Sequence, residues 1–234
     1  MTIREVYDLM AEMSAVVSET TMAKIRQILN LAMRYSMQED QFSFDRNADL
    51  DKQVDRLLIE LSDAIMEEAE KRALRDVEEE DRDKVLSWIR RKQGDMDLTE
   101  RMDQHASNLK YILGIYLADR FAKKMSRTDI IGGIMPYIGT GKHHFGRGVN
   151  SNPIKGMTLT GETAILEGFH EETVLDAERK GAKYYEVHRG SNYDCPDCDE
   201  MCYSGGGYRR YHIYDDIPVP LHPRCHCRIV PIYE

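Results

Sequence analysis

Apolar residues recur at intervals of three and four through the first 93 residues, a stretch that contains neither Gly nor Pro. That spacing places apolar side chains on one face of a helix, and the two strongest breakers of regular structure are absent. The pattern therefore predicts one long helix, or two in series, from Ile3 to about Gln38. Its buried stripe is expected to comprise Val6, Tyr7, Met10, Met13, Val17, Ile25, Ile28, Leu29, Ala32 and Met33.

Two further helices are predicted before residue 126. One runs from about Leu50, with Val54, Leu57, Leu58, Leu61, Ile65 and Ala69 on its apolar face, and continues through a run of alternating charges as a solvated helix. The other begins near Thr99 and buries Met102, Leu109, Leu113, Tyr116, Leu117 and Phe121. Residues 39–49 favour turns, within which Phe42 and Phe44 are expected to pack as anchors.

The pattern changes after Met125. Residues 127–156 are rich in Gly and predict a long connecting loop. A helix follows from about Thr160 to Arg179, with Gly181 in the position of a C-terminal capping glycine. Short strands are predicted at residues 184–188 and 228–233, on either side of the cysteines.

These elements predict an α+β protein with three consecutive parts. Residues 1–126 form a helical region and residues 127–156 a connecting loop. Residues 157–234 form a small zinc-stapled module that combines a helix with a β-hairpin. The fold class expected is mainly α-helical, with the strands confined to the C-terminal module.

The net charge of −9 lies entirely in the first 100 residues, which hold 24 acidic and 15 basic side chains, while the remaining 134 hold 17 of each. An acidic front half argues against contact with nucleic acid along that half and suits a solvated surface or a basic protein partner. No run of eighteen apolar residues occurs and the first residues lack an apolar signal core, so we expect a soluble intracellular protein with no membrane span.

All five cysteines lie near the carboxyl end, two of them as C-P-D-C at Cys195 and Cys198 and two within L-H-P-R-C-H-C-R at Cys225 and Cys227. Two cysteines separated by two residues chelate one centre, and a distant second pair completes a tetrahedral shell. We expect one structural Zn²⁺ per chain, bound by these four thiolates. His222 is an alternative fourth ligand, because it lies three residues before Cys225.

Other residues near the cysteines receive different interpretations. Cys202 is expected to be a free thiol, and the side chain of His226 to point away from its neighbours. Glu200 and His212 are candidate acid–base groups for a catalytic zinc, but the available ligands suffice to close the shell, which favours a structural ion. The segment Phe169-His170-Glu171 lacks the second histidine of a zinc-protease helix, whose position is occupied by Val174.

The segment Y-S-G-G-G-Y-R-R-Y-H-I-Y combines aromatic and basic residues that can stack on single-stranded bases. Its only cations are Arg209 and Arg210, and Asp215 and Asp216 follow closely. A tyrosine-rich hairpin over the metal site is therefore the preferred interpretation, and nucleic acid is the alternative partner.

The C-terminal third resembles phage head-morphogenesis proteins, the minor head family. The resemblance rests on a helix ending in glycine, then C-P-D-C, a Gly-containing loop, and L-H-P-R-C-H-C-R-I-V-P-I, over roughly residues 157–232. Where the family has Arg-Thr-Glu at the start of the helix, this chain has Thr160-Gly161-Glu162.

The resemblance implies a non-enzymatic virion component that acts in head assembly at or near the portal, or in genome delivery. Its partners would be the portal protein, the major capsid protein, or further copies of the chain in the virion. It would reside in the host cytoplasm during assembly and in the virion afterwards. The alternative hypothesis is a zinc-dependent enzyme or toxin-like effector that acts on nucleic acid.

Overall fold

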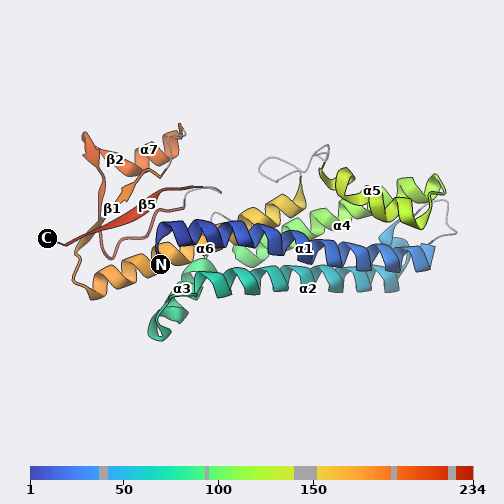
Figure 1. Ribbon diagram of the computed structural model, residues 1–234, viewed down its shortest axis with the longest axis horizontal. Helices are drawn as coiled ribbons and strands as arrows, with labels where there is room; N and C mark the ends of the chain where they lie inside the picture. The colour runs from blue at the N-terminus through green and yellow to red at the C-terminus, as the bar shows by residue number, and fades with distance from the viewer. Residues whose placement is uncertain (37–41, 93–94, 140–151, 191–193, 221–224, 234) are drawn as a thin grey trace. The chain divides into compact units, whose positions relative to one another are not determined.

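The structure is a computed structural model that describes residues 1–36, 42–92, 95–139, 152–190, 194–220 and 225–233 (Figure 1). The helices are α1 (Ile3–Ser36), α2 (Ala48–Ala73), α3 (Arg82–Ile89), α4 (Leu98–Ala122), α5 (Arg127–Gly139), α6 (Pro153–Arg179) and α7 (Pro196–Cys202). The strands are β1 (Tyr184–His188), β2 (Tyr203–Ser204), β3 (Gly207–Tyr208), β4 (Arg210–His212) and β5 (Arg228–Ile232). The predicted α+β class, mainly helical with a small C-terminal sheet, is confirmed.

The chain forms two compact units whose residues are interleaved along the sequence. Unit 1 comprises Met1–Glu12, Glu68–Leu98 and Leu159–Glu234, and unit 2 comprises Met13–Glu67 and Thr99–Thr158. By contrast, the sequence analysis predicts three parts that follow one another along the chain, residues 1–126, 127–156 and 157–234. Helices α1, α2 and α6 each contribute residues to both units.

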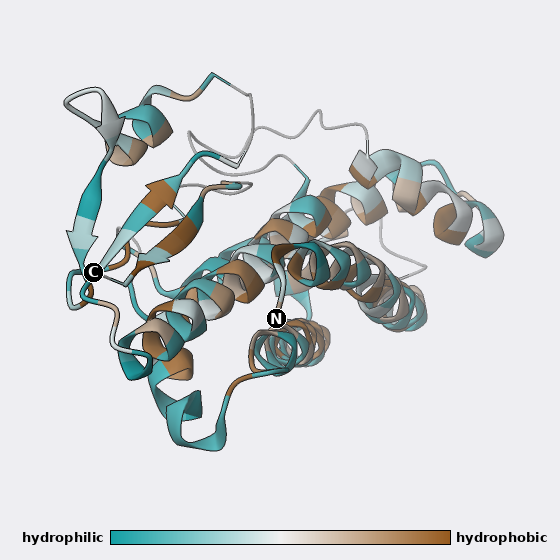
Figure 2. Ribbon diagram, turned by 60° about the vertical axis from the view of Figure 1, so that its left-hand side comes forward, coloured by the Kyte–Doolittle hydropathy of each residue, from teal (hydrophilic) through white to brown (hydrophobic). Residues whose placement is uncertain are grey.

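Unit 2 is built from amphipathic helices whose predicted apolar stripes are buried, apart from the half-buried Phe121. Its fully buried side chains include Ile25 and Leu29 of α1, Leu61 of α2, and Leu109 and Tyr116 of α4. Hydrophobic and hydrophilic residues alternate along these helices (Figure 2). Phe42 and Phe44 are buried, and Phe42 packs edge-on against both Phe44 and Phe121, which confirms their predicted role as anchors. Among the helices described here, none has both the length and the apolarity to cross a bilayer.

The loop predicted for residues 127–156 is wrong at both ends. Residues 127–139 form α5, and α6 begins at Pro153; residues 140–151 lie outside the described part. Ile130, Ile134 and Ile138 recur every four residues and are all buried, so one apolar face outweighs the low helix propensity of the glycines. The buried hydroxyl of Tyr116 donates to the carbonyl oxygen of Ile130 at 2.7 Å.

The charged run after α2 is also not one continuous helix, as the sequence led us to expect. Helix α2 ends at Ala73, and a short 3-10 helix (Glu79–Asp81) precedes α3. The turn between them carries Val77 into the core, where it is buried. The buried carboxylate of Asp81 pairs with Arg179 of α6. Core packing and this ion pair together favour the break over continued helix.

The sheet of unit 1 has the order β4-β1-β5, and both pairings are antiparallel. Alternate residues of β1 face the core, so Tyr185 and Val187 are fully buried. They join a cluster that includes Val174 and Ala177 of α6, Ile229 of β5 and four of the five cysteines, with Trp88 packed at its margin. The strands predicted on either side of the cysteines are thereby confirmed as neighbours in one sheet.

Two glycine positions shape the chain around this sheet as their sequence context predicts. Gly181 has φ of 84° at the end of α6, and the amide of Ala182 donates back to the carbonyl of Ala177 at 2.9 Å. Gly205 and Gly206 have φ of 60° and 89° in the turn between β2 and β3. Both conformations are costly for residues with a Cβ atom, which is why glycine suits them.

Gly168 permits close packing of α6 in unit 1. A Cβ atom at this position would lie 2.7 Å from the Cβ of Ala73 and 3.2 Å from Cδ1 of Ile89. Gly168→Ala is therefore expected to destabilise the protein by about 1–2 kcal/mol, since overpacking exceeds the gain in helix propensity. Gly132→Ala in α5 is the matched control, because its Cβ would meet nothing within 4 Å. Urea denaturation should show the control at or above wild-type stability; equal stability of both variants would contradict the packing argument.

Candidate metal centre

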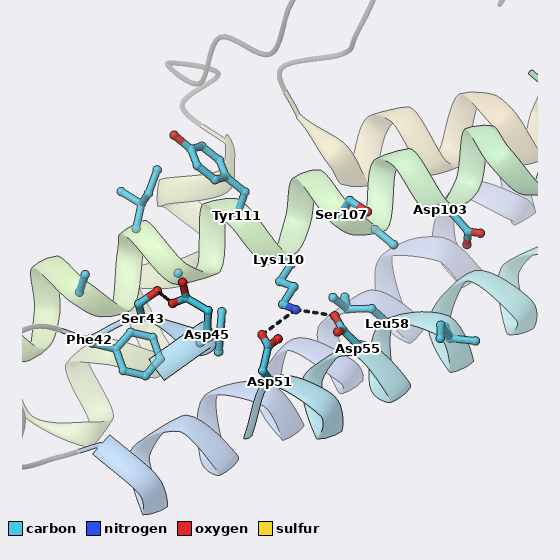
Figure 3. Close-up of a pocket in the computed structure, with 16 residues that line it drawn as sticks. Phe42, Ser43, Asp45, Asp51, Asp55, Leu58, Asp103, Ser107, Lys110 and Tyr111 are labelled. Atoms are coloured by element: carbon cyan, nitrogen blue, oxygen red, sulfur yellow. Dashed lines mark hydrogen bonds and ion pairs between the residues drawn. The ribbon is translucent and has the colours of Figure 1, made fainter. Parts of the chain in front are cut away.

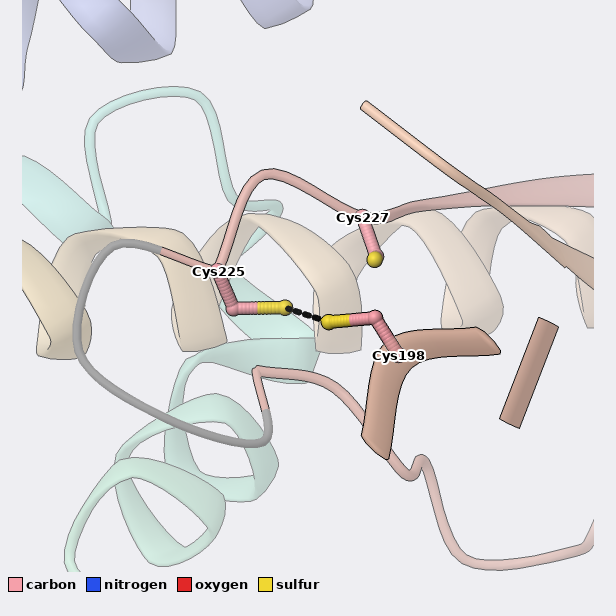
Figure 4. Close-up of side chains that lie close together, drawn as sticks. All are labelled: Cys198, Cys225 and Cys227. Atoms are coloured by element: carbon pink, nitrogen blue, oxygen red, sulfur yellow. Dashed lines mark hydrogen bonds between the residues drawn. The ribbon is translucent and has the colours of Figure 1, made fainter. Parts of the chain in front are cut away.

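Three cysteine sulfurs converge in unit 1, as Figure 4 shows. The Sγ atoms of Cys198, Cys225 and Cys227 all lie within 4.8 Å of one another, and those of Cys198 and Cys225 are 3.9 Å apart. All three side chains are buried. This group can hold a metal ion.

Two short segments supply these sulfurs. Cys198 lies in the first turn of α7, which begins at Pro196, a residue suited to the first helical position. Cys225 and Cys227 lie just before β5, whose pairing with β1 fixes their segment. The cysteine group thus depends on the sheet, because β1 and β5 hold the second segment beside α7.

The distance between the sulfurs of Cys198 and Cys225 fits a tetrahedral thiolate site. With Zn–S bonds of about 2.3 Å, the sulfurs of a tetrahedral shell lie about 3.8 Å apart. The Cys198–Cys225 distance of 3.9 Å agrees with that value. Buried thiolates are soft ligands that select zinc and related ions over magnesium or calcium.

Cys195 and Cys202 border the group of three. Cys195 occupies the N-cap of α7, is only partly buried, and lies close enough to Cys198 to affect the pKa of its thiol. Cys202 is fully buried one helical turn after Cys198, with its sulfur 3.8 Å from that of Cys227. The sequence analysis predicts a free thiol at Cys202. The four-residue spacing between Cys198 and Cys202 on a helix is the sequence signal that could have placed Cys202 beside this group.

The L-H-P-R-C-H-C segment contains two histidines, His222 and His226. His222, the alternative ligand, lies outside the described residues. The ring of His226 packs edge-on against Tyr7 of α1, with ring centroids 5.2 Å apart. His226 is thus engaged in an aromatic contact, while Cys225 and Cys227 on either side of it turn to the metal group.

Burial keeps the thiols protonated when no metal is bound. It raises the pKa of Cys198 to about 12, with further contributions from Cys195 and Cys225. The pKa of Cys227 is raised by hydrogen bonding to Cys225 and by burial, and that of Cys202 by burial. Neutral buried thiols are poor nucleophiles, whereas a bound cation would stabilise the thiolates.

Arg189 supplies positive charge beside the cysteines. Its guanidinium donates to the carbonyl oxygen of Cys195 at 3.0 Å and pairs with the carboxylate of Asp199. These contacts connect the end of β1 to the first turn of α7. A four-thiolate zinc site carries a net charge of −2, so a nearby guanidinium would stabilise the loaded form.

The acid–base candidates for a catalytic metal do not join the group. Glu200 is exposed on α7, and His212 of β4 packs against the rings of Tyr184 and Tyr214. Over the described ranges, the only side chains grouped at metal-binding distance are the three cysteines. Neither Glu200 nor His212 is thus placed beside the buried thiols as a proton donor or acceptor.

Helix α6 buries His170 and partly buries Glu171, which the sequence analysis considers only as part of an incomplete zinc-protease motif. His170 is completely buried, and burial lowers the pKa of its imidazole to about 4, although the nearby backbone of Val219 and Cys227 partly offsets this effect. A neutral imidazole thus lies between α6 and the cysteine segment. No periodic pattern distinguishes this buried histidine from a surface one, so only the packing shows its place.

Glu171, the next residue, makes stability depend on pH. Burial raises the pKa of its carboxyl to about 7, partly opposed by Arg91 and Lys84. Because the folded-state pKa is raised, the native protein binds the proton more tightly, and stability falls as pH rises from about 4.5 through 7. Glu171→Gln is expected to remove this fall and to stabilise the protein at pH 8 by on the order of 1 kcal/mol, after allowance for solvent screening. Urea titrations at pH 5 and pH 8 measure it; an unchanged pH dependence would refute it.

Comparison with known proteins adds nothing to the geometry of the cysteine group. No protein-family model, curated protein or solved structure matches the chain.

Proposed function

We propose that the chain is a structural component of a phage head, a minor head protein that assembles at or near the portal. We further propose that one zinc ion, bound by Cys195, Cys198, Cys225 and Cys227, closes its C-terminal module. The observation that carries the proposal combines motif and geometry. Cys198 of C-P-D-C and the two cysteines of H-P-R-C-H-C-R have sulfurs that all lie within 4.8 Å of one another.

Burial supports a structural ion in preference to a catalytic one. Cys225 and Cys227 are 1% and 3% exposed, and Cys198 is 4% exposed. A catalytic zinc needs an open position for water or substrate. When bound, the ion would supply a cross-link between α7 and β5, and the surrounding side chains would exclude water from it.

Cys202 is proposed to support the shell without joining it. Burial keeps its thiol protonated, and the thiol donates to the sulfur of Cys227 at 3.8 Å. Such a hydrogen bond orients a metal-bound thiolate and tunes its charge. The half-buried Cys195 then completes the shell by rotation of its side chain about χ1.

Single substitutions distinguish the two cysteines. Cys195→Ser is expected to lower zinc affinity by at least a hundredfold, because a ligand is lost, and Cys202→Ala by about tenfold, because only a hydrogen bond to a ligand is lost. Competition with a chromophoric chelator measures both affinities. Larger loss in Cys202→Ala than in Cys195→Ser would instead make Cys202 the fourth ligand.

The virion role is tested by association and by particle content. Tagged chain, co-expressed with the portal and major capsid proteins of its source, is expected to retain the portal protein through purification. Purified particles should contain the chain, while tag alone retains neither protein. Absence from particles together with hydrolysis or modification of nucleic acid by the zinc-loaded chain would favour the alternative, an enzyme or effector.

A further inference from the structure

Unit 2 has a groove between α2 and α4 that encloses about 840 Å³ (Figure 3). Its α4 wall runs from Asp103 to Ala118, with lining residues spaced three and four apart. At 1.5 Å per residue this wall is roughly 22 Å long, or about four helical turns. A second stripe of α4 therefore faces this opening, in addition to the one buried in the core.

The groove gathers large apolar side chains that remain accessible. Ile59 of α2 is 57% exposed, and Tyr111 and Ile115 of α4 are 61% and 40% exposed. Within the described residues, Ile59 and Ile115 are the two exposed isoleucines. Their concentration at one place distinguishes this groove from the scattered apolar residues of an ordinary surface.

The charged residues of the groove are predominantly acidic. Asp45, Asp51, Asp55 and Asp103 face a single ammonium group, that of Lys110, for a formal balance of −3. Lys110 pairs with both Asp51, at 2.7 Å, and Asp55. In Figure 3 the remaining two carboxylates, Asp45 and Asp103, lie at opposite ends of the groove.

We propose that this groove binds an amphipathic helix of a partner protein, with apolar side chains along one face and Lys or Arg near both ends. An apolar face about four turns long would cover Ile59, Tyr111 and Ile115, as helices do in other helix-lined grooves. Basic residues at its ends would meet Asp45 and Asp103, and charge complementarity selects such a helix over an acidic one. This proposal does not rest on the proposed virion role, because the groove would bind a helix of this chemistry in any assembly.

A designed peptide tests the surface without knowledge of the natural partner. The probe is a fluorescein-labelled 18-residue helix with Leu on one face and Lys near both ends, and the control peptide is a scramble of the same composition. Fluorescence anisotropy is expected to show micromolar binding of the probe and at least about tenfold weaker binding of the scramble. Equal binding of the two peptides, or equal binding of a version with Glu in place of Lys, would overturn the proposal.

Paired variants locate the binding site on the protein. Tyr111→Arg is expected to weaken binding by about tenfold, while Tyr214→Arg, a change at an exposed tyrosine of unit 1, leaves it unaltered. Asp103→Lys is expected to weaken it by roughly threefold at low salt, and Asp63→Lys, on the exposed side of α2, to have no such effect. Both members of each pair should melt within a few degrees of wild type.

Two results would refute the assignment. One is peptide binding that Tyr111→Arg leaves unchanged. The other is self-association: if sedimentation shows a dimer that Tyr111→Arg dissociates, the occupant is a second copy of this chain and not a basic partner helix.

Discussion

The double variant Cys225→Ser/Cys227→Ser is expected to bind no zinc and to lose the folded C-terminal module. Two of the three converging sulfurs are removed, so the remaining thiols cannot form a tetrahedral shell. In small metal modules the binding free energy, on the order of 10 kcal/mol, is also folding free energy. The cysteines belong to the same buried cluster as Tyr185 and Val187, so disruption should extend to the β4-β1-β5 sheet.

Metal analysis and hydrogen exchange together measure this effect. The wild-type chain should contain about one zinc, and its β1 and β5 amides should be protected; the variant should show neither property. Tyr203→Ser, which introduces the same residue at an exposed position next to α7, is the control and should behave like wild type. A metal-free wild-type protein, or a variant whose strand amides remain protected, would contradict the metal-staple model.

Gly190→Ala is expected to destabilise unit 1 by about 3 kcal/mol and to weaken metal binding as well. A Cβ atom at Gly190 would overlap the carbonyl oxygen and the carbonyl carbon of His226. Both atoms are backbone, so no side-chain rotation relieves the overlap, and the segment must move. That segment carries Cys225 and Cys227, which links this distant glycine to the metal site.

Gly207→Ala provides the matched control in the same module. A Cβ atom at Gly207 would meet nothing within 4 Å, so the change should alter stability by less than about 0.5 kcal/mol. Chemical denaturation and chelator competition, applied to both variants, separate backbone overlap from a general effect of alanine. If the two glycine variants have equal stability and equal zinc affinity, Gly190 does not hold the cysteine segment in place.

Local patterns were sufficient for much of the fold. The three- and four-residue spacing located α1, the stripe of α4 and the helix before Gly181, because a helix needs only a periodic apolar face and suitable ends. The same approach misjudged residues 127–139, where glycines indicated a loop but Ile130, Ile134 and Ile138 supply a buried helical face. It also missed the break after Ala73, which the burial of Val77 requires.

The candidate metal centre was likewise predicted from the sequence only in part. Ligand chemistry and spacing predicted Cys195, Cys198, Cys225 and Cys227 as one group. The structure brings the sulfurs of the last three together and places Cys195 at the border of the group. The four-residue spacing places Cys202 on the same side of a helix as Cys198. Its contact with Cys227, and that of His170 with the cysteine segment, depends on how α7 and α6 pack against the sheet. The position of His222 lies outside the described residues and stays a prediction.

By itself, the sequence determined the helical character of the chain, the strands on either side of the cysteines and the cysteines that can hold a metal ion. These follow from short-range periodicity and from the soft, chelating chemistry of closely spaced thiols. Only the tertiary structure decided which sulfurs approach one another and that Gly190 must lack a side chain beside His226. It also decided that Ile59 and Ile115 share one acidic groove. These features join residues far apart along the chain, and the distances between such residues are set by packing alone.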